Sequence, residues 1–317
     1  MTWPWKLNTP TAPPIPGVRW GALALMLGRC GNLRVGRLLL YLILAGPRSA
    51  RDWWPLFLYN TAPHGVSDSE STVDRLPRRR KRPGALIITR ASENWAALHL
   101  AENHVEAALA LRALVSADSA LRKAGWSPPR GGLIVVCPDD LFEASAHWPQ
   151  SAHMGGYTKP SLGVVVPLRS CAARDFTRMV AHELVHLGGP VDGGCLAPAW
   201  LEEGVAELVS FRAYPGAPRW PPDHGRQALR DFDTAAWANS ANPYLTSEPY
   251  TRGWAACGAL ADIHGLAAVR RLLHLARQYG LSSEVYEAAF GLSTAEVEQQ
   301  LRQTGDRAGD AAIAPCV

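Results

Sequence analysis

The apolar and polar positions of this chain follow two different periods, and the change from one to the other predicts an α+β fold. Short apolar runs at residues 85–89 and 132–137 are typical of buried strands, and residues 93–123 place apolar side chains at helical spacing. Asp139 follows the second run and predicts the cap of a short helix that ends near residue 147. The first part of the folded chain is therefore expected to alternate strands and helices.

A hairpin is predicted after this short helix. Residues 156–158 and 162–168 have the composition of two strands, and the Lys-Pro-Ser sequence at 159–161 separates them. The second of these strands immediately precedes the helical half of the chain.

From residue 172 onward, the predicted elements are helices. The Gly-Gly-Pro sequence at 188–190 ends the first of them. The predicted helices are residues 172–187, 198–214, 250–264, 266–279 and 294–303. Residues 84–317 are thus expected to form one domain, with a small mixed sheet and helices over 84–190 and a mainly helical C-terminal lobe over 191–317.

The N-terminal quarter has a different composition and is expected to lie outside this domain. Residues 1–50 contain no Asp or Glu and end near the apolar run 38–45, an order that resembles an export signal. The eight residues of this run fall well short of the roughly 20 that span a bilayer as a helix. Translation from Met26 would give the signal a compact charged start; the alternative is an uncleaved basic leader that is disordered or associates with a membrane. Residues 51–83, with a basic run at 78–82, are predicted to be an exposed linker, and the protein is expected to be secreted or held at the cell envelope.

Charge is distributed unevenly along the chain. Of its 32 Lys and Arg and 28 Asp and Glu, residues 1–83 carry 13 and 4, which leaves 19 and 24 for residues 84–317. The folded part shows no basic stripe with interleaved aromatic residues, so no nucleic-acid partner is expected. The six cysteines include no CxxC pair, which argues against a structural zinc ribbon. Cys171 and Cys195 are candidates for a disulfide, and free buried cysteines are the alternative.

The sequence His-Glu-Leu-Val-His at 182–186 is the strongest chemical signal in the chain. At roughly 100° per residue, His182, Glu183 and His186 share one face of the predicted helix. Two neutral imidazoles one turn apart can bind a single zinc ion, and Glu183 beside them can accept a proton from water activated by that ion. The alternative is an exposed helix on which the histidines have no such role.

A second segment, Trp-Leu-Glu-Glu-Gly-Val-Ala-Glu at 200–207, contains a candidate for the third ligand. Glu203 lies 17 positions after His186, and Glu202 competes with it by adjacency but points about 100° away on a helix. Glu207 falls one turn after Glu203 on the same face, where it could accept the ring N–H of a zinc-bound histidine or simply be a surface residue.

Together, the sequences HELVH and WLEEGVAE resemble the gluzincin metallopeptidases, and in particular the peptidase-MA-like group. The resemblance implies a zincin-like fold over roughly residues 85–303, with zinc held by His182, His186 and Glu203. It also matches Pro-Tyr-Thr-Arg-Gly at 249–253 to an element of the aminopeptidase branch. There, a tyrosine faces the tetrahedral intermediate, which would make Tyr250 an oxyanion donor; a core tyrosine is the alternative.

The resemblance also implies that the strand at 163–168 is an edge strand that pairs with an extended peptide substrate. Two departures from the family pattern bear on activity. The gap between His186 and Glu203 is slightly short, and the Gly-x-Met-Glu-Asn motif that binds a free amino terminus is missing. The sequence therefore predicts a zinc-dependent peptidase acting on a peptide or protein. A non-catalytic zinc-binding protein, or a membrane-associated interaction protein with the same fold, is the alternative.

Overall fold

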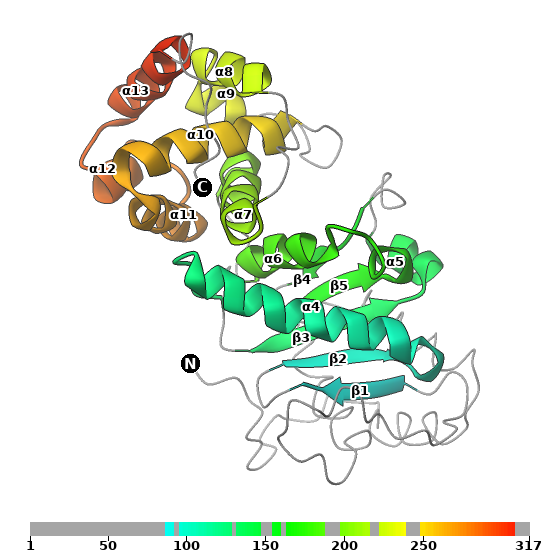
Figure 1. The fold of residues 1–317 in the computed structure, drawn as a ribbon. Coiled ribbons are helices and arrows are strands. Elements are labelled where there is room, and N and C mark those ends of the chain that lie inside the picture. The colour runs from blue at the N-terminus through cyan, green and yellow to red at the C-terminus, as the bar shows by residue number, and fades with distance from the viewer. Residues whose placement is uncertain are drawn as a thin grey trace, which may run out of the picture. The chain divides into compact units, whose positions relative to one another are not determined.

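The protein has an α+β fold in which a five-stranded sheet precedes a series of helices (Figure 1). The computed structural model describes residues 86–91, 95–128, 131–146, 154–159, 163–187, 197–215, 222–238 and 248–307. The predictions for the leader (1–50) and the linker (51–83) therefore lie outside the described residues. None of the described helices is both long and apolar enough to cross a membrane.

The chain divides into two compact units. One contains the described residues up to Asp118 together with Pro128–Val180, and the other contains Ser119–Ser127 and the residues from Ala181 onward. The division falls within the helix that carries the histidine pair, so both histidines belong to the second unit.

The first unit is built on a mixed sheet with strand order β1-β2-β3-β5-β4. The strands are β1 (Leu86–Arg90), β2 (Trp95–Leu100), β3 (Gly132–Cys137), β4 (Tyr157–Lys159) and β5 (Gly163–Pro167). β2, β3 and β5 run parallel, and the outer strands β1 and β4 pair antiparallel with their neighbours. The three inner strands are buried along their whole length, as near-continuous apolar runs are in a parallel sheet.

Two predictions for this unit are wrong. Residues 95–100, assigned to the long helix, form β2; an Ala- and Leu-rich run suits a helix, but its place between β1 and β3 buries it as a strand. β5, expected to be an edge strand, lies between β3 and β4, so the short β4 is the edge. The predicted strands β1 and β3 and the hairpin of β4 and β5 are confirmed.

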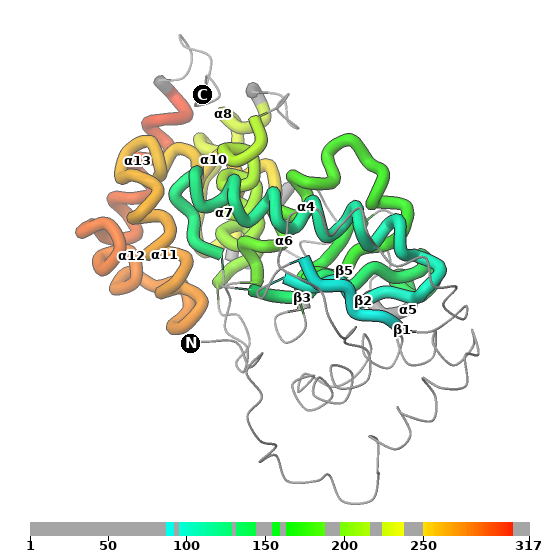
Figure 2. Tube along the Cα trace, turned by 60° about the horizontal axis from the view of Figure 1, so that its bottom comes forward, coloured from blue at the N-terminus to red at the C-terminus, as the bar shows by residue number. Residues whose placement is uncertain are grey.

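Helices complete the first unit. The short η3 (Ala101–Asn103) leads into α4 (His104–Lys123), which lies against the sheet in both views (Figures 1 and 2). α5 (Asp139–Ala146) begins at the predicted Asp139, and η5 (Leu168–Ser170) follows β5. The next helix, α6 (Phe176–His186), begins in this unit.

Every described element of the second unit is helical. Its helices after α6 are α7 (Ala199–Ala213), α8 (Pro222–Arg230), α9 (Thr234–Ala238), α10 (Glu248–His264), α11 (Leu266–Tyr279), α12 (Ser283–Phe290) and α13 (Thr294–Arg307). The predictions for α7, α10, α11 and α13 are confirmed, whereas α8, α9 and α12 were not predicted. α10 packs against α7, α8 and α11, and the rings of Trp200, Phe232 and Trp237 meet edge to face beside α7.

Candidate metal centre

The histidine pair lies in the last two turns of α6, where the local sequence keeps one helix face apolar. Val180, Ala181, Leu184 and Val185 are fully buried, and they anchor the helix while the histidines point to its other side. His182 and Glu183 are also buried, with exposed fractions of 9% and 8%. Burial of two such polar side chains within one turn requires polar partners nearby.

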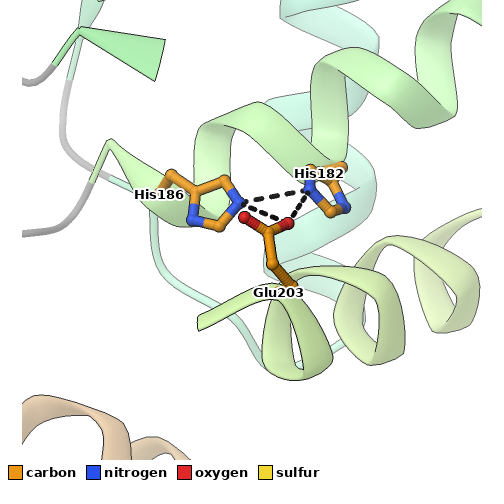
Figure 3. A group of neighbouring side chains, drawn as sticks. All are labelled: His182, His186 and Glu203. Carbon is orange, nitrogen blue, oxygen red and sulfur yellow. Dashed lines mark hydrogen bonds and ion pairs between the residues drawn. The ribbon is translucent and has the colours of Figure 1, made fainter. Parts of the chain in front are cut away.

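Glu203 on α7 meets both histidines at one point (Figure 3). The Nε2 atoms of His182 and His186 are 3.1 Å apart, and Oε2 of Glu203 lies 3.1 Å from the first and 3.5 Å from the second. All three ligand atoms lie within 4.8 Å of one another. His182, His186 and Glu203 therefore form a group that could hold a metal ion.

The charges around this group favour a cation among the ligand atoms. Burial alone would lower the pKa of the His182 imidazole, but the hydrogen bond to Glu203 and the charge of Glu207 raise it. The pKa of His186 is held well above its ordinary value, against the effect of burial, by the charge of Glu203 and the hydrogen bond to Glu202. Although burial would raise the pKa of the Glu203 carboxyl, the charge and hydrogen bonds of the two imidazoles lower it strongly.

Glu207 lies beside the other nitrogen of His182. Its Oε1 is 3.5 Å from the Nδ1 atom, which is buried and makes no hydrogen bond. A carboxylate in this position attracts the Nδ1 proton, which leaves the lone pair of Nε2 directed at the cluster. The structure thus places Glu207 beside His182, at the distance of an ion pair and not of a hydrogen bond.

Glu202 lies beside the Nδ1 atom of the other histidine, His186. Its Oε2 lies 3.4 Å from Nδ1 of His186, and both carboxylate oxygens accept hydrogen bonds from Arg277, at 2.6 and 2.7 Å. Burial would raise the pKa of Glu202, but the hydrogen bonds from Arg277 and then from His186 hold it at about 2. The structure thus places Glu202 beside Nδ1 of His186, and Glu203 in the group that could hold a metal ion.

Arg277 was not found by the sequence analysis. It lies on α11, 75 positions after Glu202, and only 7% of it is exposed. The helical pattern of α11 predicted the element but carried no signal for its partner. The one hint in the sequence is an arginine at a position where the helical period expects a buried residue, because arginine is seldom fully buried unless it is paired.

The position of Tyr250 depends on a close crossing of α7 and α10. A Cβ atom on Gly204 would lie 2.3 Å from the Gly253 carbonyl carbon, and one on Gly253 would lie 2.0 Å from the carbonyl oxygen of Trp200. Only glycine allows the two backbones to approach so closely. The crossing brings Tyr250, one turn before Gly253, to the centre, where its ring stacks on His182 with centroids 6.1 Å apart.

Glu183 lies between the two histidines in sequence and is buried beside them. Its charge is among the causes that raise the pKa of His186. The structure therefore brings together His182, His186, Glu203, Glu207 and Tyr250, and Glu183 directly follows His182 on α6.

Other features contribute no residue to this centre. Cys137, Cys171 and Cys257 are buried free cysteines, so Cys171 is not in a disulfide, and its expected partner Cys195 lies outside the described residues. A cavity of about 770 Å³ beside α11 is lined by Arg212, Arg270, Arg271 and His274 among others, none of them in the cluster. The prediction of a site thus depends on convergent side chains, not on a cavity.

Comparisons with known proteins do not add to this picture. No model of a protein family matches the chain, and no curated protein matches it in sequence. The centre must therefore be interpreted from its own chemistry.

Proposed function

We propose that this chain is a zinc-dependent metallopeptidase of the gluzincin type, with a zincin-like fold and a single zinc held by His182, His186 and Glu203. The observation that carries the proposal is the convergence of two imidazole nitrogens and one carboxylate oxygen on one point. Two histidines and a glutamate are a ligand set of catalytic zinc sites, which keep a fourth position open.

The spacing of the three ligand atoms supports zinc. Ligands bound tetrahedrally at 2.0–2.1 Å lie about 3.3 Å from one another. The corresponding distances are 3.1, 3.1 and 3.5 Å. These distances support zinc, and carboxylates face both Nδ1 atoms, where zinc-bound histidines usually have a polar partner.

Zinc bound at this position would polarise a substrate carbonyl and lower the pKa of a coordinated water toward about 7. Glu183 is the general base: its carboxylate accepts a proton as the water oxygen adds to the carbonyl carbon. The same proton then passes from Glu183 to the amide nitrogen as the C–N bond breaks, so the carboxylate is restored. This role requires Glu183 near the ligands but not among them, as its position on α6 allows.

Tyr250 supplies the hydrogen bond that the carbonyl oxygen needs as it gains negative charge. The stacking of its ring on His182, a proposed ligand, supports this role. A hydroxyl that donates to the developing oxyanion stabilises the transition state more than the ground state.

Export by way of residues 1–50 is a separate part of the proposal, which fractionation of the producing cells would test.

The proposal is tested by the zinc content of the purified full-length chain. Elemental analysis of the wild type should give one zinc per chain, and the variants Glu203→Ala and Glu203→Gln should lose it. Glu287→Gln is the matched control, because this exposed glutamate on α12 lies outside the cluster. Glu183→Gln should keep the zinc and lose hydrolysis of a peptide library.

The results separate the enzyme from a non-catalytic zinc protein. Zinc in the wild type together with hydrolysis that depends on Glu183 supports the peptidase. Zinc without any hydrolysis across a broad library would favour the non-catalytic alternative. No zinc in the wild type, prepared without chelator, would refute the proposal altogether.

A further inference from the structure

A buried ion pair joins three helices at the edge of the metal cluster. Arg277 on α11 donates from Nε and from one terminal nitrogen to the two oxygens of Glu202 on α7. The side chains are only 8% and 13% exposed. The same terminal nitrogen donates to the carbonyl oxygen of Val185 on α6, at 3.3 Å.

The further contacts of this ion pair involve His186 or the residue directly before it. Val185 directly precedes His186, and its carbonyl is one of the last of α6, which have no partner within the helix. Oε2 of Glu202 lies 3.4 Å from Nδ1 of His186 and also accepts from Arg277. Arg277 therefore fixes both the backbone that carries His186 and the carboxylate that faces its ring.

Stability alone is a poor explanation for such a pair. Burial of two opposite charges costs several kcal/mol of desolvation for each, and apolar residues of similar volume often replace buried pairs without loss. The fork of an arginine does one thing that apolar residues cannot, which is to hold a carboxylate in a single orientation. Here the held carboxylate points at a metal-ligating ring.

We propose that Arg277 is a positioning residue of the metal centre, acting through Glu202 on His186. Held by Arg277, the Glu202 carboxylate accepts the Nδ1 proton of His186, which keeps the Nε2 lone pair directed at Glu203 and His182. The inference rests on the proposed function, because it assigns the pair to the presentation of a zinc ligand. The hydrogen bonds of Arg277 go to Glu202 and to the Val185 carbonyl, so its action on the His186 ring is indirect.

The test compares zinc affinity, by competition with a chromophoric chelator, in the full-length variants Glu202→Gln, Arg277→Lys and Arg277→Met. Loss of an outer hydrogen bond of this kind weakens metal binding about 10- to 100-fold. Arg277→Met should show the full loss, and Arg277→Lys an intermediate one because lysine keeps the charge but not the fork. In Glu202→Gln, one of the two donor nitrogens of Arg277 must face the amide NH2 group instead of an acceptor oxygen. This variant should therefore also weaken zinc binding.

A spectroscopic readout separates positioning from general damage. Long-range ¹H–¹⁵N NMR of the zinc-loaded protein reports which ring nitrogen of His186 bears the proton and how strongly its Nδ1 proton is hydrogen-bonded. The control is Arg302→Met on α13. Arg302 also bonds a carboxylate and a backbone carbonyl, those of Glu298 and Phe232, but neither residue belongs to the cluster. If Arg277→Met does not fold, Glu202→Gln and Arg277→Lys decide the question.

The outcomes for this inference and for the proposed function are distinct. Weaker zinc binding and a changed Nδ1 signal in the Glu202 and Arg277 variants, with wild-type behaviour of Arg302→Met, support positioning. Zinc in the wild type, with affinity and Nδ1 signal unchanged in all Glu202 and Arg277 variants, overturns this inference and leaves the peptidase proposal standing. Absence of zinc from the wild type overturns both.

Discussion

The glycine crossing of α7 and α10 gives the sharpest prediction of stability. We expect Gly253→Ala to destabilise the protein, although alanine is the better helix former. The added Cβ would lie 2.0 Å from the Trp200 carbonyl oxygen and 2.9 Å from the Cα of Gly204. Both are backbone atoms of a packed helix, so neither can turn aside as the end of a long side chain could.

The magnitude follows from the size of the overlap. Ordinary van der Waals contacts of a Cβ atom begin at 3.4 Å. The two helices would therefore have to separate by roughly 1 Å, and much of the dispersion energy along their contact would be lost. Overpacking of this kind costs about 1–3 kcal/mol, occasionally more, and alanine returns up to about 1 kcal/mol through its helix propensity. Because the clash is between backbones, we expect a net loss of about 2 kcal/mol.

Gly258→Ala on the same helix is the matched control. A Cβ there would meet no atom within 4 Å, so only the helix propensity changes and the protein should gain about 0.5–1 kcal/mol. Urea denaturation of both variants, in the presence of chelator, measures the difference as a shift of the midpoint. Equal stability of the two variants would refute the reasoning.

Three further predictions concern the centre itself. Glu183→Gln should bind zinc as the wild type does, while kcat falls about 10²- to 10⁴-fold in a peptide assay; retained activity would exclude Glu183 as the base. Tyr250→Phe should lower kcat about 10²- to 10³-fold with little change in KM, and a change in KM alone would point to substrate binding instead. The pKa of Glu202, about 2 in the fold against an ordinary 4.5, makes its stabilising contribution fully present above about pH 4.5 and lost as the pH falls toward 2. Acid denaturation of Glu202→Gln should lack this part of the pH dependence, and an unchanged acid profile would contradict it.

The sequence predicted the helical half of the fold better than the sheet. α7, α10 and α11 have one face of apolar residues at a helical period, or boundaries marked by glycine and proline, and such signals are local. β2 has no comparable signal, because its Trp-Ala-Ala-Leu-His-Leu sequence becomes a strand only between β1 and β3. The position of β5 inside the sheet depends likewise on pairing with β3, which lies far away in sequence.

The same distinction between local and distant signals holds at the candidate metal centre. His182 and His186 are one turn apart, and Glu203 and Glu207 are one turn apart, so the helical period alone put each pair on one face. The ion pair of Arg277 and Glu202 beside His186 could not be found this way, because the two residues lie on different helices. The packing role of Gly253 could not be predicted either, because a sequence does not indicate which neighbouring backbone packs against a glycine.

α7 shows how one helix can serve both histidines. Glu203 faces the Nε2 atoms, while Glu202, about 100° around the helix, and Glu207, one turn further, face the Nδ1 atoms of His186 and His182. Carboxylates on a helix this deeply buried are costly unless each meets a cation. Arg277 neutralises Glu202, and the imidazoles, whose pKa values are raised by the neighbouring carboxylates, are the groups that would carry balancing protons beside Glu203 and Glu207 in the metal-free protein. A metal ion that replaces these protons would keep the charges balanced, so zinc binding should release protons, and calorimetry in buffers of different ionisation enthalpy should measure one or two per zinc, on the order of the number of ligand imidazoles. Binding without any proton release would mean that the imidazoles are already neutral and that the three carboxylates of α7 are balanced in some other way.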